Sequence, residues 1–215
     1  MLLLLVLVLL VIWTIWAHKM YIKDRIKVQG PYINVENVKK GDELEEKVVK
    51  LTKEKIPNSK IIRNIIIPNG KKGTTEIDIL VVSEFGNLCI ECKNYNAKIV
   101  GNIKDFQWVL HYGKTQIKKY SPLKQNTRHI FCLRNLVPTQ YENIVIFGEK
   151  TNLDENLYKN NSIMKIEKFE KFLDKFINLD KIQDERRVEN LYDFFKEYQP
   201  SEVDKRNHIE YVSSI

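Results

Sequence analysis

Apolar and polar residues alternate along several short runs of the chain, and this alternation predicts β-strands. Successive side chains of a strand point to opposite faces of the sheet, so a period of two marks a strand with one buried face. The predicted strands are residues 60–67, 76–82 and 88–93, and a buried strand is predicted at 143–147. The connection 83–87 contains Gly86 and predicts a hairpin turn between the second and third strands.

A further hairpin is predicted at residues 106–112 and 114–119, which turn at Gly113. The aromatic side chains that share one face of it with Leu110 are Phe106, Trp108 and Tyr112. Exposed aromatic rings can stack on nucleic-acid bases, but rings at alternating strand positions more often pack in a core. We interpret these rings as core packing.

A wider spacing of apolar residues predicts helices. The first helix follows Gly41, with its apolar stripe at Leu44, Val48, Val49 and Leu51, and ends before Pro57. Ser121 and Pro122 have the residue types of a helix N-cap and first helical position. Later helices are predicted from 165 to 177 and from 181 to 198, and the chain after Pro200 is predicted to be loose.

The first residues predict a membrane anchor. Residues 1–17 are apolar except Thr14, and a helix of this length spans roughly 25 Å, near the thickness of a bilayer core. The stretch lacks the early basic residue and the cleavage site of a signal peptide, which favours an uncleaved span. Basic residues follow at once, so we expect a single-pass membrane protein with its N-terminus outside and its C-terminal domain in the cytoplasm.

We divide the chain at changes of composition. The predicted parts are a transmembrane anchor at 1–17, a juxtamembrane basic connector at 18–39, a core at 40–150, a C-terminal strand and helices at 151–199 packing on or beside the core, and a tail at 200–215. The cysteines Cys89, Cys92 and Cys132 are few and lie in apolar runs, which fits a reducing compartment. Cys89 and Cys92 fall on opposite strand faces, so buried thiols are favoured over a zinc site.

The net charge of +7 is concentrated in one segment. Between residues 94 and 136 the only acidic residue is Asp105, whereas the rest of the chain carries equal numbers of each sign. The basic residues expected to bind nucleic acid are Lys98, Lys104, Lys114, Lys118, Lys119, Lys124 and Arg128. Such a segment suits a polyanion, DNA or RNA. The alternatives are a solvated basic face or attraction to anionic lipid headgroups.

Charged residues interrupt two otherwise apolar strands. Glu91 and Lys93 share one face of their strand, and the predicted hairpin brings the strand of Asp78 beside them. Two carboxylates this close repel unless a divalent cation lies between them, and Mg²⁺ favours such sparse oxygen coordination. The pattern predicts a metal site. The alternative is an exposed strand whose charges form cross-strand pairs.

The order of these residues, an Asp followed about a dozen residues later by Glu-x-Lys, resembles the signature of the PD-(D/E)xK nuclease superfamily. Residues 40–136 resemble its nuclease-related domain (NERD) branch. The matching segments are Lys40-Gly41-Asp42-Glu43-Leu44-Glu45, Gly73-Thr74-Thr75-Glu76-Ile77-Asp78, Ile90-Glu91-Cys92-Lys93-Asn94-Tyr95, Gly101 with Trp108, and Pro122-Leu123-Lys124-Gln125-Asn126. Ile79 and Cys92 depart from the residues usual there, His and Thr, and neither change removes a carboxylate.

The resemblance implies an α/β fold of the α+β type, with a restriction-endonuclease-like mixed sheet flanked by helices. It implies that Asp78, Glu91, Lys93 and Gln125 serve catalysis. Asp78, Glu91 and the backbone carbonyl of Cys92 would hold Mg²⁺, or Mn²⁺ in its place. The Glu of the first helix, Glu45, would join the site, although an ordinary surface Glu is the alternative.

The expected function is that of a membrane-anchored, metal-dependent nuclease acting on DNA or RNA. The second hypothesis is a membrane-tethered module that keeps the nuclease fold but only binds nucleic acid or acts as a scaffold. The third is a membrane-surface protein whose basic segment meets lipid alone. Loss of cleavage in an Asp78→Asn variant would separate the first from the other two.

Overall fold

The computed structural model describes residues 35–70 and 73–213. The chain divides into two compact units, residues 1–39 and 40–215, and the second unit contains nearly all of the described residues. The predicted anchor at 1–17 lies outside the described residues. Among the helices that are described, none has the length and apolar character needed to cross a bilayer.

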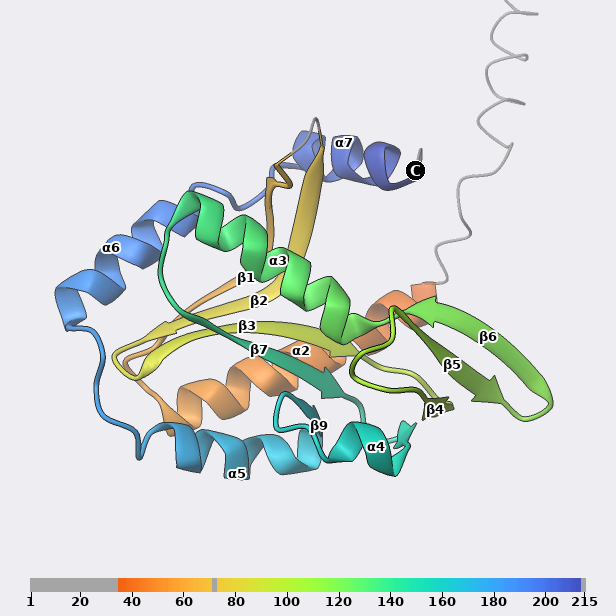
Figure 1. The fold of residues 1–215 in the computed structure, drawn as a ribbon. Coiled ribbons are helices and arrows are strands. Elements are labelled where there is room, and N and C mark those ends of the chain that lie inside the picture. Colours follow the sequence, from red (N-terminus) through yellow and green to blue (C-terminus); the bar gives the residue numbers. More distant parts are fainter. Residues whose placement is uncertain (1–34, 71–72, 214–215) are drawn as a thin grey trace, which may run out of the picture. The chain divides into compact units, whose positions relative to one another are not determined.

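The strands of the second unit form two β-sheets, and helices connect several of these strands (Figure 1). The helices are α2 (Val35–Lys55), α3 (Pro122–Leu136), α4 (Glu155–Tyr158), α5 (Ile166–Phe176), α6 (Glu185–Lys196) and α7 (Glu202–Ser213). The strands are β1 (Lys60–Pro68), β2 (Thr74–Ser83), β3 (Gly86–Lys93), β4 (Lys98–Val100), β5 (Gln107–Tyr112), β6 (Thr115–Tyr120), β7 (Tyr141–Phe147), β8 (Asn152–Leu153) and β9 (Ile163–Lys165).

The larger sheet has the strand order β1-β2-β3-β7-β9, and the smaller one has the order β6-β5-β4-β8. Strands β1, β2 and β3 are antiparallel, whereas β7 and β9 run parallel to β3. Mixed pairing of this kind, with helices between the strands, makes the fold mixed α+β. The predicted strands and both predicted hairpins are confirmed.

Three of the predicted boundaries are wrong. Helix α2 begins at Val35 rather than after Gly41, so the end of the predicted connector at 18–39 is helical, while 18–34 lie outside the described residues. Helix α6 begins at Glu185 rather than at residue 181. The tail predicted to be loose contains α7.

Helix α7 is tied to the end of the β1–β2 hairpin, which explains its order. Asn69 Nδ2 donates to Tyr211 Oη at 2.9 Å, and Thr74 Oγ1 lies 2.8 Å from His208 Nδ1. A Cβ atom on Gly73 would collide with the ring of Tyr211, so this close approach requires glycine. These contacts join segments far apart in the chain, which a local pattern does not reveal.

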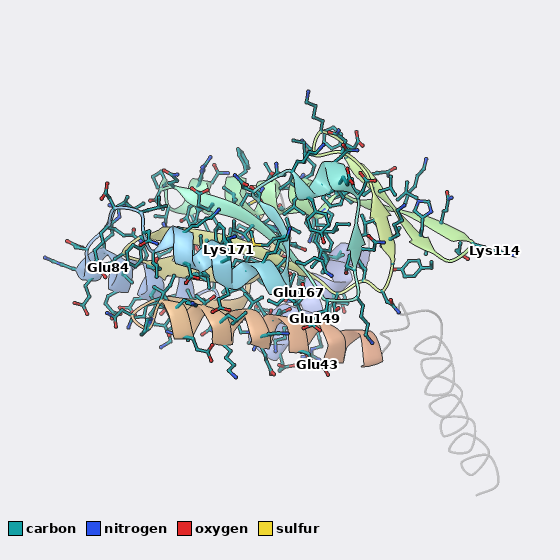
Figure 2. The ribbon with its side chains drawn as sticks, turned by 90° about the horizontal axis from the view of Figure 1, so that it is seen from below. Glu43, Glu84, Lys114, Glu149, Glu167 and Lys171 are labelled. Atoms are coloured by element: carbon teal, nitrogen blue, oxygen red, sulfur yellow. The ribbon has the colours of Figure 1, made fainter. Side chains whose placement is uncertain are left out.

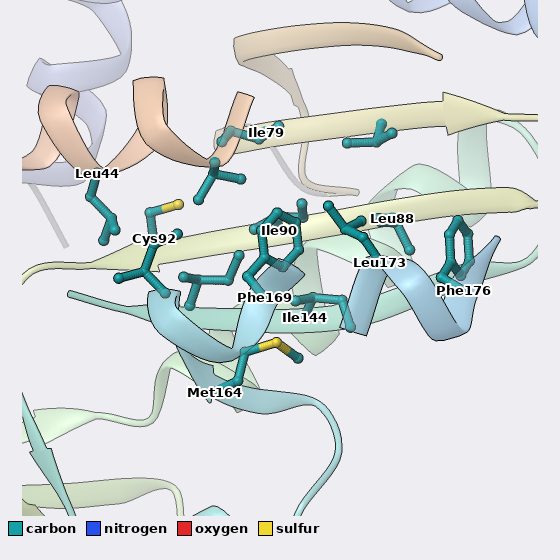
Figure 3. Close-up of a cluster of buried hydrophobic side chains, with 14 of the residues drawn as sticks. Leu44, Ile79, Leu88, Ile90, Cys92, Ile144, Met164, Phe169, Leu173 and Phe176 are labelled. Carbon is teal, nitrogen blue, oxygen red and sulfur yellow. The ribbon is translucent and has the colours of Figure 1, made fainter. Parts of the chain in front are cut away.

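Helices cover both faces of the larger sheet (Figure 1). On one face α2 and α5 pack over apolar side chains of β2, β3 and β7, and Figure 3 shows the centre of this cluster around Ile90, Phe169 and Leu173. On the other face α3 and α6 pack over a second cluster that includes Leu80, Leu133 and Phe195. Burial of these two clusters holds the sheet between two helical layers.

At one point in β1 and β2, the regular alternation of side chains between the two faces of the sheet is interrupted. Asn64 of β1 has a left-handed φ of 53°, and the ladder pairs Arg63 with Ile79 and Ile65 with Ile77 without pairing the residues between them. Leu80 lies in the α3 and α6 cluster, and so does Ile77, three residues away, which strict alternation would place on the opposite face. Asp78 therefore lies at a kink, where its side chain leaves the regular alternation.

The smaller sheet has a core of its own. Trp108 and Leu110 of β5 are buried with Ile99 of β4 and Phe147 of β7. Trp108 Nε1 donates to the carbonyl of Asn102 at 2.9 Å. The prediction of core packing is thus correct for Trp108. It is wrong for Phe106 and Tyr112, whose side chains are 68% and 38% exposed because they lie at the ends of β5, beyond the buried cluster.

Candidate functional site

The side chain of Asp78 extends from the kink in β2 to the backbone of β3. The β2–β3 ladder ends at the pair Ile79 and Ile90, and beyond it the backbone N–H of Cys92 donates to Asp78 Oδ2 at 2.8 Å. A side-chain carboxylate therefore takes the place of the backbone acceptor that a continued ladder would provide. This bond holds the Asp78 carboxylate beside the end of β3.

Glu91 and Lys93 lie on the face of β3 that looks toward α3. Glu91 is fully buried, and Lys93 forms an ion pair with its Oε1. Leu88, Ile90 and Cys92 belong to the opposite, α2 and α5 cluster. The predicted division of β3 into a charged face and an apolar face is confirmed; on the charged face Glu91 is buried and Lys93 is half-buried.

His129 of α3 is a partner of Glu91 that the sequence signals only weakly. Its Nε2 lies 3.2 Å from Glu91 Oε2, and its Nδ1 lies 2.9 Å from Thr75 Oγ1. A histidine fixed at both ring nitrogens orients the carboxylate that it faces. Its position one helical turn after Gln125 was the available signal, but only the fold brings β2, β3 and α3 together here.

The pKa values of the two carboxyl groups are shifted in opposite directions. Burial, reinforced by the charge of Glu91, raises the pKa of Asp78 well above its usual range. Burial alone would also raise the pKa of Glu91, but Lys93 and His129 outweigh it and hold that pKa below the usual value. Glu91 is thus the ionised member of the pair, while Asp78 ionises at a cost that a bound cation would remove.

Lys93 remains a cation despite its burial. Burial by itself lowers the pKa of a lysine, but the charges of Glu91 and Asp78 outweigh burial and raise the pKa of Lys93 above its ordinary value. An amine held in this state donates hydrogen bonds and positive charge. It does not accept protons near neutral pH.

The donor set fits a small divalent cation. Both carboxylate oxygens of Glu91 are buried and lack a partner in hydrogen-bond geometry, although Lys93 and His129 lie at ion-pair distance from them. Such oxygens retain unused acceptor capacity. Within residues 35–70 and 73–213, no group of three His, Cys, Asp or Glu side chains forms a metal-holding cluster.

Cys92 faces the site with its backbone alone. Its side chain packs in the α2 and α5 cluster, and burial raises the pKa of its thiol well above the usual value. Cys89 lies in the other cluster, and its Sγ donates to Asn126 Oδ1 at 3.0 Å. The two thiols are therefore separate, buried and protonated, as the sequence predicted.

Glu45 lies near the two carboxylates but has a partner of its own. Its Oε2 accepts from Arg63 Nη2 at 3.1 Å, and its charge contributes to the raised pKa of Asp78. Burial raises the pKa of Glu45 itself, against the opposing effect of Arg63. Gln125 is half-buried in α3, and no hydrogen bond joins its side chain to Asp78, Glu91 or Lys93 in the described structure.

Asn126 is a structural residue of the site that the sequence did not reveal as such. Its Nδ2 donates to the carbonyl of Cys89 at 2.7 Å, to Asn143 Oδ1 at 2.8 Å and to the carbonyl of Ile144 at 3.1 Å. This buried amide joins α3 to β3 and β7. It fixes the helix that presents His129 to Glu91.

The basic residues predicted to bind nucleic acid are distributed over several surfaces. Lys98 and Lys118 lie in β4 and β6, and Lys124 lies over the exposed ring of Phe106 at 5.5 Å from its centroid. Figure 2 shows Lys114 at the tip of the β5–β6 hairpin. Lys104, Lys119 and Arg128 are exposed elsewhere on the loop before β5, on β6 and on α3.

A mixed-sheet α+β domain with Asp78, Glu91 and Lys93 gathered at one strand end defines a nuclease-like class of protein. Residues 40–148 match the nuclease-related domain, NERD, and this stretch is half of the chain. The chain therefore belongs to the NERD family, as the sequence motifs indicated. An uncharacterized protein of Bacillus anthracis is 31% identical over 97 residues, which are 44% of this chain and 46% of that protein. The chain thus spans less than half of this relative. No solved structure matches the chain.

Proposed function

We propose that this protein is a metal-dependent nuclease that hydrolyses phosphodiester bonds in DNA or RNA, on a restriction-endonuclease-like core. The observation that carries the proposal is the meeting of Asp78, Glu91 and Lys93 where β2 leaves β3. A fully buried carboxylate beside a half-buried carboxyl group and a half-buried lysine costs free energy of desolvation. A metal-assisted reaction accounts for that cost.

Asp78, Glu91 and the backbone carbonyl of Cys92 would hold Mg²⁺, or Mn²⁺ in its place, with Glu45 as a further ligand. When bound there, the cation supplies Lewis acidity and an acidified water to phosphoryl chemistry. The unused oxygens of Glu91 and the raised pKa of Asp78 support this assignment.

The remaining groups of the site bind and orient. Lys93 is a fixed positive charge that stabilises the negative charge developing on a phosphate in the transition state. Its raised pKa favours this role over that of a base that deprotonates water. His129 and Thr75 hold the Glu91 carboxylate in position, and Gln125 orients substrate or water from the same helix.

The sequence of residues 1–17 supports the proposal of a single-pass membrane protein with a cytoplasmic C-terminal domain. The substrate would then meet the site at the inner face of the membrane. The basic segment between residues 94 and 136 would hold DNA or RNA there.

A second candidate function is a membrane-tethered module that binds nucleic acid without cleaving it. The ion pair between Lys93 and Glu91 is the observation that favours it, because a cation already occupies the ionised carboxylate. In that case Lys93 compensates the negative charge of the site, and metal is not required.

Cleavage assays on the full-length chain separate the two functions. Single- and double-stranded DNA and RNA are incubated with Mg²⁺, Mn²⁺ or a chelator, with Asp78→Asn beside wild type and Glu76→Gln as the matched control from the same strand. The nuclease predicts metal-dependent cleavage that Asp78→Asn abolishes and Glu76→Gln retains. Binding without cleavage in every condition identifies the second function, and cleavage that survives Asp78→Asn contradicts the proposed site.

A further inference from the structure

The smaller sheet has one covered face and one open face. Trp108 and Leu110 point into the core with Ile99, and their side chains are at most 2% exposed. Every residue of β6 is exposed along its whole length, and β6 is the edge strand of this sheet. The face opposite Trp108 is therefore available along β4, β5 and β6.

The register decides which side chains share the open face. Directly paired residues of antiparallel strands point to the same side. The cross-strand rows opposite Trp108 are Lys98 with His111 and Gln116, Val100 with Val109 and Lys118, and Gln107 with Tyr120. Lys119 pairs with Trp108 and Tyr112 pairs with Thr115, so these residues belong to the side of Trp108, which is itself exposed along β6.

The composition of the open face suits a polyanion with exposed bases. None of the strands β4, β5, β6 and β8 contains an acidic residue. Lys98 and Lys118 supply positive charge, and Tyr120 supplies a ring that is 48% exposed. His111 adds a second ring between them.

We propose that single-stranded nucleic acid binds across this open face, with bases stacked on Tyr120 and His111 and phosphates held by Lys98 and Lys118. The inference rests on the proposed function, since it assigns the substrate class of the same nuclease. The bound strand is the substrate of Asp78, Glu91 and Lys93.

A single strand fits this face better than a duplex or a lipid surface. Stacking on an aromatic ring needs a base whose flat side is free, and a duplex hides the flat sides of its bases. Membrane-surface elements present large apolar side chains to the lipid. The open face instead carries two glutamines, and its valines Val100 and Val109 are small and half-buried.

The chain runs directly from this face to the site. Strand β6 ends at Tyr120, and Ser121 caps α3 while its N–H donates to the carbonyl of Phe106 at 2.8 Å. His129, which contacts Glu91, lies about 12 Å further along the helix at 1.5 Å per residue. The open face therefore ends directly before the helix that carries His129.

Two matched pairs of variants test the proposal on the full-length chain. Lys118→Ser removes a charge from the open face, and Lys171→Ser removes the same charge from the exposed side of α5, outside the basic segment. Tyr120→Ala and Tyr112→Ala remove the same ring from the open face and from the side of Trp108. Affinity is measured by fluorescence anisotropy with labelled oligothymidylate and with a duplex of equal length, and folding is checked by circular dichroism.

Lys118→Ser and Tyr120→Ala are each expected to weaken single-strand binding by about five- to tenfold, and their matched partners by less than about twofold. Wild type is expected to bind the single strand more tightly than the duplex. Equal losses within the pairs, tighter duplex binding, or binding only to phosphatidylserine vesicles would each overturn the inference. Failure of the nuclease proposal looks different, because it leaves binding intact and cleavage absent.

Discussion

At the scale of single residues, the site combines two carboxylates with opposite tendencies. Lys93 and His129 keep Glu91 ionised, whereas Asp78 ionises against burial and against the charge of Glu91. A carboxyl group whose pKa is raised on folding binds its proton more tightly in the folded state. Stability is therefore lost as pH rises from the unfolded pKa, about 3.9, through the folded pKa.

Asp78→Asn should stabilise the metal-free protein near neutral pH. Asparagine keeps an oxygen that can accept a hydrogen bond from the Cys92 N–H but cannot ionise. Each kcal/mol of unfolding free energy regained raises Tm by about 2–4 °C in a chain of this size. The measurement is thermal unfolding in chelator at several pH values. The gap between variant and wild type should close as pH falls toward about 4.

The exposed Asp193→Asn of α6 is the control, and its Tm should follow wild type at every pH. A variant Asp78→Asn that is less stable than wild type at neutral pH would show that the ionised carboxylate stabilises the fold. The inference that ionised Asp78 destabilises the folded state would then be wrong.

The proximity of Asp78 to Glu91 and Lys93 was predictable because hairpin spacing and strand alternation are local. The partner of Glu91 was not, because His129 lies on a helix that begins far along the chain. The kink at Asn64 was also hidden, since it depends on one left-handed residue that interrupts the ladder opposite Asp78. Alternation alone would not have turned Asp78 toward the Cys92 N–H.

At the scale of elements, α3 links the two sheets to the site. It starts at the Ser121 cap directly after β6, and Asn126 ties it to β3 and β7. The cap and the Pro122 start were readable from the sequence, because they are local signals. The role of Asn126 was not readable, because the sequence does not show whether an asparagine side chain is buried or exposed.

Asn126→Ala should destabilise the protein by about 2–4 kcal/mol, since it leaves buried carbonyls of Cys89 and Ile144 without their donor. Urea unfolding measures this change. Arg134→Ala on the exposed side of the same helix is the control and should change stability by less than about 0.5 kcal/mol. An unfolding midpoint unchanged by Asn126→Ala would show that α3 is held by its apolar face alone.

At the scale of the molecule, the elements were more predictable than their contacts. The strands and both hairpins were visible in the sequence, whereas Gly101 and Trp108 were known only as residues of the family pattern and prove to be in close contact. The structure adds a reason for the glycine, because a Cβ atom on Gly101 would collide with the Trp108 ring. Helix α7 was missed because its contacts to Asn69 and Thr74 bridge far-apart segments.

Lys93 and the two carboxylates are proposed to perform chemistry rather than to hold the fold or the nucleic acid. The basic segment and the open sheet face concern binding and would persist in an inactive protein. Binding and cleavage must therefore be measured on the same variant. Lys93 is the residue to change, because it is the cation assigned to the transition state.

The most direct measurement is single-turnover cleavage of a labelled strand by Lys93→Met at saturating protein, with binding measured in parallel. Lys98→Met on the open face is the matched lysine. The proposed mechanism predicts that Lys93→Met slows cleavage by about 10²- to 10³-fold with binding nearly unchanged, and that Lys98→Met weakens binding while saturated cleavage stays close to wild type. Cleavage by Lys93→Met at the wild-type rate would contradict that mechanism.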